Sequence, residues 1–308
     1  MTWTDAGGDA QMLALVQQVG RVQTFVSGAS RCLAGVHPAR PDIGAVGDWV
    51  GEESVLRQAE AWLRDQGCHV ARGPMELCSW FTYRVNDGPT VDEPFLMEPQ
   101  ERPERWMDAG YSDAAHYTST LMPHEPILTQ TQTLSERLRS EGWSIQSLPR
   151  GPDGTVPELA YRSAIARIHT MAHEAFADAF GFCPIPVQVM QELYAPYRAV
   201  IDPDLVFIAS APDGTDAGFL FGIGDLAAPH RKWAIIKTSA IRPRYAGRRI
   251  GTWLNATAHL RFRRKGYNEV VYALMWEGSA SQGWSRYGGR SLRRYRLLQR
   301  SLNPTSSE

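Results

Sequence analysis

Residues 241–254 read Ile-Arg-Pro-Arg-Tyr-Ala-Gly-Arg-Arg-Ile-Gly-Thr-Trp-Leu, and this stretch decides the fold. It follows an apolar, strand-like run, residues 233–241, and leads into residues with helical character, 252–265. A glycine-containing turn that opens a helix directly after a strand points unpaired backbone N–H groups at one place, and the helix dipole adds about half a positive charge there. Pyrophosphate fits such a turn. Three arginines of the stretch can pair with its oxygens: Arg244, Arg248 and Arg249.

The same stretch resembles the end of the fourth strand and motif A of the GCN5-related N-acetyltransferases (GNATs), whose consensus is Gln/Arg-x-x-Gly-x-Gly/Ala. In the alignment this consensus falls on residues 246–251. Gly251 and the frequent additional glycine, Gly247, are present, whereas Ala246 replaces the first Gln or Arg and Arg249 replaces the first required glycine.

The sequence after this turn extends the resemblance. Residues 264–274, Arg-Lys-Gly-Tyr-Asn-Glu-Val-Val-Tyr-Ala-Leu, resemble the end of the family's helix and its fifth strand. Residues 285–289, Ser-Arg-Tyr-Gly-Gly, resemble its closing Lys-Leu-Gly-Phe segment. The resemblance therefore covers Trp143 to Arg300.

The first half of the chain resembles the same fold through residues 59–74 and 108–111. In place of a phosphate loop it has Asp-Trp-Val-Gly-Glu-Glu-Ser at 48–54, and carboxylates there would repel pyrophosphate. We therefore predict an α+β protein of two tandem GNAT-like modules, each a mixed, mostly antiparallel sheet flanked by helices. The predicted boundaries are 1–122 for a degenerate module, 123–141 for a linker, and 142–304 for the acyltransferase module.

Hydrophobic periodicity and Gly/Pro breakers give the elements of both halves. The predicted strands are 22–26, 32–36, 43–50, 69–72, 95–98, 116–120, 143–148, 205–210, 218–223, 233–241, 270–275 and 292–298. The predicted helices are 52–66, 102–109, 158–180, 187–194, 252–265 and 279–287. Both halves thus share one order of strands and helices, which indicates an internal duplication.

The resemblance implies that an acyl thioester, usually acetyl-coenzyme A, lies between the fourth and fifth strands and that an amine attacks it directly. No metal and no cofactor beyond this donor are expected. Backbone N–H groups of the fourth strand would polarise the thioester carbonyl. The predicted donor-binding residues are Thr238, Ser239, Ala240, Ile241, Arg244, Gly247, Arg248, Arg249, Ile250, Gly251 and Thr252.

A lysine-like amine must lose a proton before it attacks. With a reference pKa near 10.4, deprotonation at neutral pH costs roughly 4 to 5 kcal/mol, which favours a nearby base. Glu277, at the end of the fifth strand, is the first candidate, and a salt bridge to a neighbouring arginine is the plain alternative. Asp202 and Glu174 are weaker candidates, since the sequence favours a helix cap or surface acid for each.

In the family, the general acid is a tyrosine four residues before a glycine of the last helix. Counting back from Gly288 gives Trp284, so that tyrosine is missing. Tyr287 or Ser285 could substitute, with simple packing as the alternative for Tyr287. The predicted acceptor pocket consists of Phe176, Tyr194 and Tyr197, and core packing is again the alternative.

Composition is that of a globular protein: 308 residues, 43% hydrophobic and 21% charged, enough for two domains. No run approaches the roughly 18 apolar residues of a membrane helix, and Asp5 and Asp9 stand where a basic leader would begin, so a cytoplasmic protein is expected. The cysteines have no metal-like spacing and are predicted to be reduced core thiols: Cys32, Cys68, Cys78 and Cys183.

Charge is distributed unevenly along the chain. Residues 244–300 carry 13 basic and 2 acidic side chains, a net charge of +11, although the whole chain has −1. This stretch either meets an anion or is balanced by the acidic half across a domain contact.

Three functions are compatible with these observations. The first is an N-acyltransferase that uses acyl-CoA and the amine of a small molecule, for example in natural-product biosynthesis or antibiotic resistance. The second keeps acyl transfer but takes an aminoacyl-tRNA or acyl-carrier protein as donor, because the charge exceeds the need of one coenzyme and Arg249 would crowd pyrophosphate. The third is a non-catalytic ligand-binding sensor.

Overall fold

The computed structural model describes residues 6–88, 93–129 and 131–303. The strands are β1 (Arg21–Ser27), β2 (Ser30–Val36), β3 (Ile43–Val50), β4 (Val70–Gly73), β5 (Val85–Asn86), β6 (Ser112–Met122), β7 (Ser144–Ser147), β8 (Val206–Ser210), β9 (Asp216–Gly224), β10 (Trp233–Ile241), β11 (Glu269–Trp276) and β12 (Arg290–Ser301). The α-helices are α1 (Ala6–Gln17), α2 (Glu53–Asp65), α3 (Glu104–Asp108), α4 (Glu125–Thr129), α5 (Gln132–Ser140), α6 (Glu158–Ala175), α7 (Val187–Tyr194) and α8 (Ile250–Arg264). The short 3-10 helices include η4 (Pro243–Tyr245) and η5 (Ala280–Tyr287).

The two halves repeat one order of elements. Each has three antiparallel strands, a helix and a strand that runs parallel to the third: β1, β2, β3, α2, β4 in the first half and β8, β9, β10, α8, β11 in the second. The parallel pairing is short in both, residues 43–45 with 70–72 and residues 233–236 with 269–272. A parallel pair needs a crossover connection, and α2 and α8 supply it. The predicted α+β fold with a mixed, mostly antiparallel sheet is confirmed.

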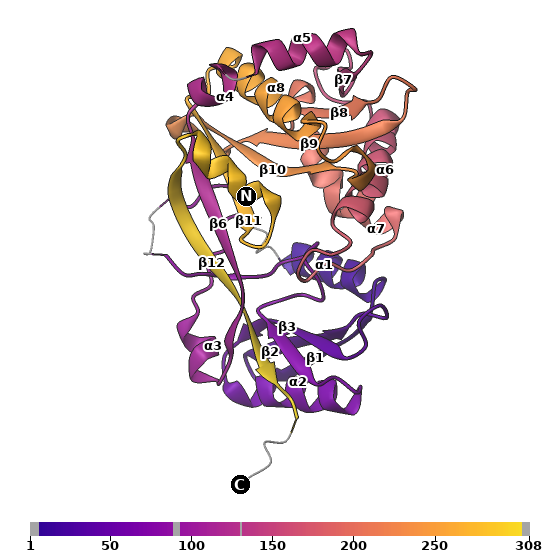
Figure 1. The fold of residues 1–308 in the computed structure, drawn as a ribbon. Helices are drawn as coiled ribbons and strands as arrows, with labels where there is room; N and C mark the ends of the chain where they lie inside the picture. Colours follow the sequence, from indigo (N-terminus) through magenta and orange to yellow (C-terminus); the bar gives the residue numbers. More distant parts are fainter. Residues whose placement is uncertain (1–5, 89–92, 130, 304–308) are drawn as a thin grey trace.

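Each half also gives one strand to the other. The sheet runs β1-β2-β3-β4-β12-β6-β11-β10-β9-β8-β7, with β5 paired to β12. Thus β6, from the first half, lies beside β11, and β12, from the second half, pairs with β4. Figure 1 shows β6 and β12 running side by side from the upper part of the molecule into the lower part. Neither half completes its sheet alone. Without β6 or β12 from the other half, a sheet edge with unpaired N–H and C=O groups would remain.

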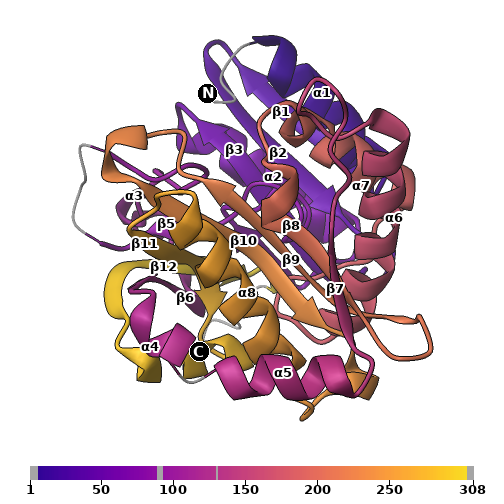
Figure 2. The ribbon, with the colours of Figure 1, turned by 90° about the horizontal axis from the view of Figure 1, so that it is seen from above.

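Helices cover the sheet on both sides. One cluster of buried side chains joins α1, α6 and α7 to residues of both halves, such as Met75 and Phe219. A second lies under α8, α4 and α5, where Trp253 and Phe262 are fully buried, and a third lies under α2. Figure 2 shows α5 and α8 near each other, with α6 and α7 at another side of the strands. The segment that joins the halves is thus helical and packed, with Ile127 and Leu138 in the core.

The structure corrects several predicted elements. Residues 95–98 are not a strand, because the N–H of Phe95 donates to Glu98 Oε2 at 3.2 Å and the N–H of Leu96 donates to Asp225 Oδ1 at 2.9 Å. Helix α6 ends at Ala175 and not near residue 180, and residues 280–287 form a 3-10 helix. No predicted element covers α1. Its sequence shows no helical periodicity, because the apolar residues of α1 lie on no single face of the helix.

The four cysteines are buried and free, as predicted for core thiols. Within the described part of the chain, no helix has both the length and the apolar character needed to cross a bilayer. Likewise, in the described ranges, no three His, Cys, Asp or Glu side chains are grouped so that they could hold a metal ion.

Candidate functional site

Strands β10 and β11 separate after Ile236 and Tyr272. Both strands have an irregularity at this level: in β10 the register shifts between Ile236 and Thr238, and in β11 it shifts between Tyr272 and Met275. Beyond these points β10 pairs with β9 and β11 pairs with β6. The facing edges of residues 237–241 and 273–276 therefore lack ladder partners, and we call this opening the strand split.

The turn after β10 presents backbone N–H groups. Gly247 has φ 77° and Arg249 has φ 62°, and Arg249 is the N-cap residue of α8. No side chain of the described residues caps this helix, which leaves the N–H groups of its first turn without a side-chain acceptor. Donor binding by Ile250 to Thr252 stays a prediction. The left-handed conformation of Arg249 costs roughly 1–2 kcal/mol, yet it gives the backbone the shape that glycine adopts at that place.

Free positive charge is concentrated on this turn. Arg244, Arg248 and Arg249 are exposed, and the described residues include no salt bridge to any of them. Other basic residues of the 244–300 stretch are compensated within the chain. The paired ones are Arg263 with Glu125, Lys265 with Asp202 and Asp204, Arg290 with Glu269, Arg293 with Glu98, Arg296 with Asp87 and Asp113, and Arg300 with Glu60.

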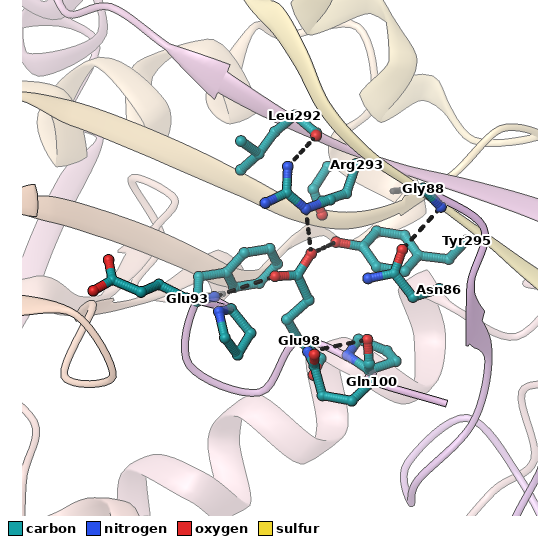
Figure 3. A network of polar contacts seen from close by, with 12 residues as sticks. Asn86, Gly88, Glu93, Glu98, Gln100, Leu292, Arg293 and Tyr295 are labelled. Atoms are coloured by element: carbon teal, nitrogen blue, oxygen red, sulfur yellow. Dashed lines mark hydrogen bonds and ion pairs between the residues drawn. The ribbon is translucent and has the colours of Figure 1, made fainter. Parts of the chain in front are cut away.

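Several of these pairs join β12 to the first half. Figure 3 shows Glu98 pointing toward both Tyr295 and Arg293 of β12. The Tyr295 hydroxyl donates to Glu98 Oε1 at 2.7 Å, and Arg293 Nε lies 3.4 Å from the same oxygen. Several basic residues of β12 are therefore paired with acids of the first half, which is one of the two explanations predicted for the uneven charge. Besides the three arginines of the turn, Arg264, Arg286 and Arg294 of this stretch are also exposed and have no ion pair among the described residues.

Predicted acceptor residues lie at the strand split together with a residue that the sequence analysis missed. Lys237, at the β10 bulge, donates from Nζ to the Tyr194 hydroxyl at 3.0 Å. Its Nζ also lies 4.6 Å from the ring centroid of Tyr194 and 5.5 Å from that of Tyr197. Phe176 is the half-buried C-cap residue of α6, and no described contact joins it to this group. A lone lysine inside the apolar run 233–241 was the available signal for Lys237.

The first half of the chain forms the other side of the strand split. The Arg84 guanidinium lies 3.7 Å from the ring centroid of Tyr83 and 4.6 Å from that of Tyr117. Its Nη1 donates at 2.9 Å to the carbonyl oxygen of Leu274, a residue of the irregular part of β11 with φ 57°. Both irregular strand segments therefore have a cationic side chain beside them, and no motif in the first half had indicated Arg84.

The predicted catalytic side chains have different surroundings. Glu277 is exposed just after β11, and its N–H donates to the carbonyl of His116 at 3.0 Å. Tyr287 is buried, with its ring 5.5 Å from that of Trp284 between centroids. The side chain of Ser285 lies outside the part of the chain that the structure describes.

The two weaker base candidates are held in ion pairs. Glu174 pairs with Arg242, which lowers the pKa of the carboxylate and makes it a weaker base. Asp202 accepts from the N–H of Asp204 as an N-cap, and it also pairs with Arg150 at 2.7 Å and Lys265 at 2.5 Å. Both residues are therefore a cap or surface acid, the alternative considered for them above.

The corresponding split in the first half is filled by backbone. After β4, the N–H of Met75 donates to the carbonyl of Val46 in β3 at 2.7 Å. A Cβ on Gly47 would lie only 2.9 Å from the Met75 carbonyl, which shows how closely the two segments approach. Near the end of β3, Asp48 forms an ion pair with Arg31, and the residue before α2 is Glu52.

Comparison with known proteins gives the same fold. No protein-family model matches the sequence, and no curated protein matches it. Among solved structures, a protein of Enterococcus faecalis V583 described as a probable N-acyltransferase superposes with a TM-score of 0.55 at 9% identity, covering 97% of this chain and 66% of that chain. A GCN5-related N-acetyltransferase of Kribbella flavida gives 0.51 at 12% identity, covering 97% of this chain and 65% of that chain.

A third solved structure is the GCN5-related glucosamine N-acetyltransferase region of a fungal multi-domain GH3 β-N-acetylglucosaminidase. It gives a TM-score of 0.54 at 13% identity, and it covers 97% of this chain and 36% of that chain. The chain thus spans about two thirds or less of the length of these three structures. At such identities the likeness concerns the fold, and the strand split followed by an uncapped helix is the part of that fold described above. The chain has the fold of the GCN5-related N-acetyltransferases.

Proposed function

We propose that the protein is an N-acyltransferase that moves an acyl group from acyl-CoA, by default acetyl-CoA, to the amine of a small molecule. The observation that carries this proposal is the strand split between β10 and β11, followed directly by the uncapped start of α8. The strand split offers unpaired strand edges for a thioester and its pantetheine arm. The start of α8, with the turn before it, offers N–H groups and three exposed arginines for pyrophosphate.

In the proposed reaction, the N–H groups of Ile250 to Thr252 hold the pyrophosphate of the donor. Backbone N–H groups of residues 238–241 stabilise the oxyanion that forms when the amine attacks the thioester carbonyl. The C–N bond forms, the C–S bond breaks, the amine proton passes to a base and coenzyme A leaves as a thiolate. We retain Glu277 as the proposed base because it is exposed and no described ion pair holds its carboxylate. A thiolate is a weak base, so acid catalysis by Tyr287 or Ser285 is helpful but not required.

We also propose that the first half is a degenerate module that does not bind a donor. Its support is the backbone of residue 75 inside the split between β3 and β4, and the acidic loop at residues 48–54. The boundaries 1–122, 123–141 and 142–304 stay a proposal about duplication along the sequence. In space, the exchange of β6 and β12 means that each module includes a strand from the other half.

The alternative donor, an aminoacyl-tRNA or acyl-carrier protein, would rest on the charge of residues 244–300. Part of that charge is paired within the chain, and the three exposed arginines of the turn adjoin the start of α8, where one pyrophosphate would bind. The third candidate, a ligand-binding sensor, differs from the first only in the absence of turnover.

Donor binding is tested by the shift of the unfolding midpoint with acetyl-CoA, coenzyme A and bulk tRNA at low and high salt. We expect acetyl-CoA to stabilise the protein. The double substitution Arg244→Ala, Arg248→Ala should weaken its binding about tenfold or more, and the exposed Arg264→Ala should not. Turnover is then followed as free thiol released with a panel of amines, and Glu277→Gln should lower it.

Two results would count against this assignment. If acetyl-CoA and coenzyme A leave the midpoint unchanged while tRNA binds in a strongly salt-dependent way, the alternative donor is supported. If Arg249→Gly and Glu277→Gln both leave thiol release untouched, the proposed site is in the wrong place.

A further inference from the structure

Two basic side chains flank the strand split and have no carboxylate partner. Lys237 belongs to the β10 bulge, and Arg84 donates to the carbonyl of Leu274 in the irregular part of β11. In the described residues, neither takes part in a salt bridge, although many other basic residues of the chain do. Their neighbours are instead aromatic rings and a tyrosine hydroxyl.

Polar atoms of this group are buried without partners. Arg84 is 8% exposed, and its Nε has no hydrogen-bond partner; the hydroxyl of Tyr117, 2% exposed, also has none. A buried donor without an acceptor is costly, and a ligand that completes the arrangement is one explanation for such a cost. Arg84 also has φ 83°, an unfavourable conformation for a residue other than glycine, and such strain is often found at binding sites.

Both side chains belong to the same level of the strand split. Lys237 directly follows Ile236, whose register partner in β11 is Tyr272, and Arg84 donates to the carbonyl of Leu274, two residues after Tyr272. Burial acts to lower the pKa of Lys237 and the facing oxygens of Tyr194 and Tyr197 act to raise it, with a net upward shift.

Solvent reaches part of this group. Tyr83 and Lys237 are each only partly buried, and Lys237 lies in the part of β10 that has no partner from β11.

We propose that Lys237 and Arg84 bind a carboxylate of the substrate at the strand split, so that the reaction involves a carboxylate-bearing molecule such as an amino acid. This inference rests on the proposed acyl transfer for the position of the reacting amine. The exposed arginines of the turn after β10 already provide for the phosphates of a donor. The carboxylate therefore belongs to the acceptor amine or to the acyl group.

The test uses the full chain and matched ligands. The unfolding midpoint is measured with L-amino acids, β-alanine and 4-aminobutyrate, and with the amide of each. Succinyl-CoA and acetyl-CoA form the second pair. The variants are Lys237→Met and Arg84→Met, which keep size and remove charge, with Lys237→Arg to restore it. The exposed Arg264→Met is the matched control.

We expect at least one carboxylate to stabilise the wild type while its amide does not. Lys237→Met and Arg84→Met should bind it about 10- to 100-fold more weakly, Lys237→Arg should recover part of the binding, and Arg264→Met should bind as the wild type does. If an amino acid shifts the unfolding midpoint and its amide does not, the carboxylate belongs to the acceptor. If succinyl-CoA shifts the midpoint more than acetyl-CoA does, the carboxylate belongs to the acyl group. Without ligand, Lys237→Met should unfold at the wild-type midpoint or above it, because the ammonium has no internal counter-ion.

The proposal is overturned if every carboxylate is without effect, if amides bind as well as acids, or if Lys237→Met and Arg84→Met bind as the wild type does. Acetyl-CoA measured alone separates this outcome from failure of the proposed function. Binding of acetyl-CoA without any carboxylate effect removes only the present inference. A carboxylate effect without acetyl-CoA binding removes acyl transfer and leaves the carboxylate site.

Discussion

A buried chain of hydrogen bonds makes stability depend on pH in a predictable direction. His124 Nε2 lies 3.0 Å from the carbonyl oxygen of Tyr267, so this nitrogen carries the proton and Nδ1 is an acceptor. His259 Nδ1, 3.1 Å from that acceptor, must therefore donate, and His259 Nε2 accepts from the Tyr272 hydroxyl at 3.0 Å. Both imidazoles are satisfied in the neutral form, and a proton added to His259 Nε2 would require the Tyr272 hydroxyl to turn from donor to acceptor.

Burial, together with the neighbouring His124, lowers the pKa of His259 from 6.5 to about 3. The unfolded chain takes up a proton near pH 6.5, and the folded chain does not until much lower pH. The stabilising contribution of this residue is therefore complete above pH 6.5 and is lost as the pH falls from 6.5 toward 3. By linkage, the free energy of unfolding should fall by about 2 kcal/mol between pH 7 and pH 5 on account of His259 alone.

The assay is urea unfolding followed by tryptophan fluorescence at pH 7 and pH 5, for the wild type and His259→Gln. The amide of glutamine does not titrate, so the variant should lose about 2 kcal/mol less than the wild type between these pH values. His230→Gln, at an exposed histidine, should change the pH dependence by less than about 0.5 kcal/mol. If His259→Gln and wild type lose stability in parallel, the assignment of a neutral His259 is refuted.

Two further predictions concern the turn after β10 and the joining of the halves, and both are measured by urea unfolding at pH 7. Arg249→Gly should leave the free energy of unfolding unchanged or raise it by up to about 1 kcal/mol, because glycine adopts φ 62° without strain. The control Arg248→Gly should lower it by about 0.5–1 kcal/mol. The reverse order of the two variants would contradict the backbone conformation assigned to Arg249. Glu98→Ala should lower the free energy of unfolding by about 3–5 kcal/mol, because it leaves Tyr295 and Arg293 without their carboxylate partner. The control Glu104→Ala, at an exposed position, should lower it by less than about 1 kcal/mol. Equal effects would show that the Glu98 network does not hold β12.

Local patterns in the sequence were sufficient where a short segment determines its own conformation. The strand over residues 233–241 and the helix over residues 187–194 were predicted with their observed bounds, because alternating or helical burial is visible within a few residues. The left-handed backbone at Arg249 follows the glycine pattern of the motif, although the residue itself differs. Residues 95–98 were predicted wrongly because the N–H of Phe95 donates to the Glu98 side chain and the N–H of Leu96 donates to Asp225. The partner of Leu96 is distant in sequence, and no local pattern encodes it.

The candidate site shows the same division. The proposed donor turn could be predicted as a unit because its residues are consecutive, and its donor binding stays a prediction. Lys237 and Arg84 are 153 positions apart in number, and they flank the same strand split only because the two halves pack together. The compensation of β12 charges by acids of the first half also depends on the packing.

Local sequence patterns account for the class of fold, the repeated order of strands and helices, and the position of the turn that we propose to bind an anion, since these depend on periodicity and on short-range backbone preferences. The exchange of β6 and β12 is visible only in the folded chain, as is the filling of the first half's split by Met75. The same holds for Lys237 and Arg84, which lie beside the split of the second half without counter-ions among the described residues. Strand order and charge pairing are settled by which distant segments satisfy each other's hydrogen bonds and bury each other's surface, and a linear pattern does not specify those partners.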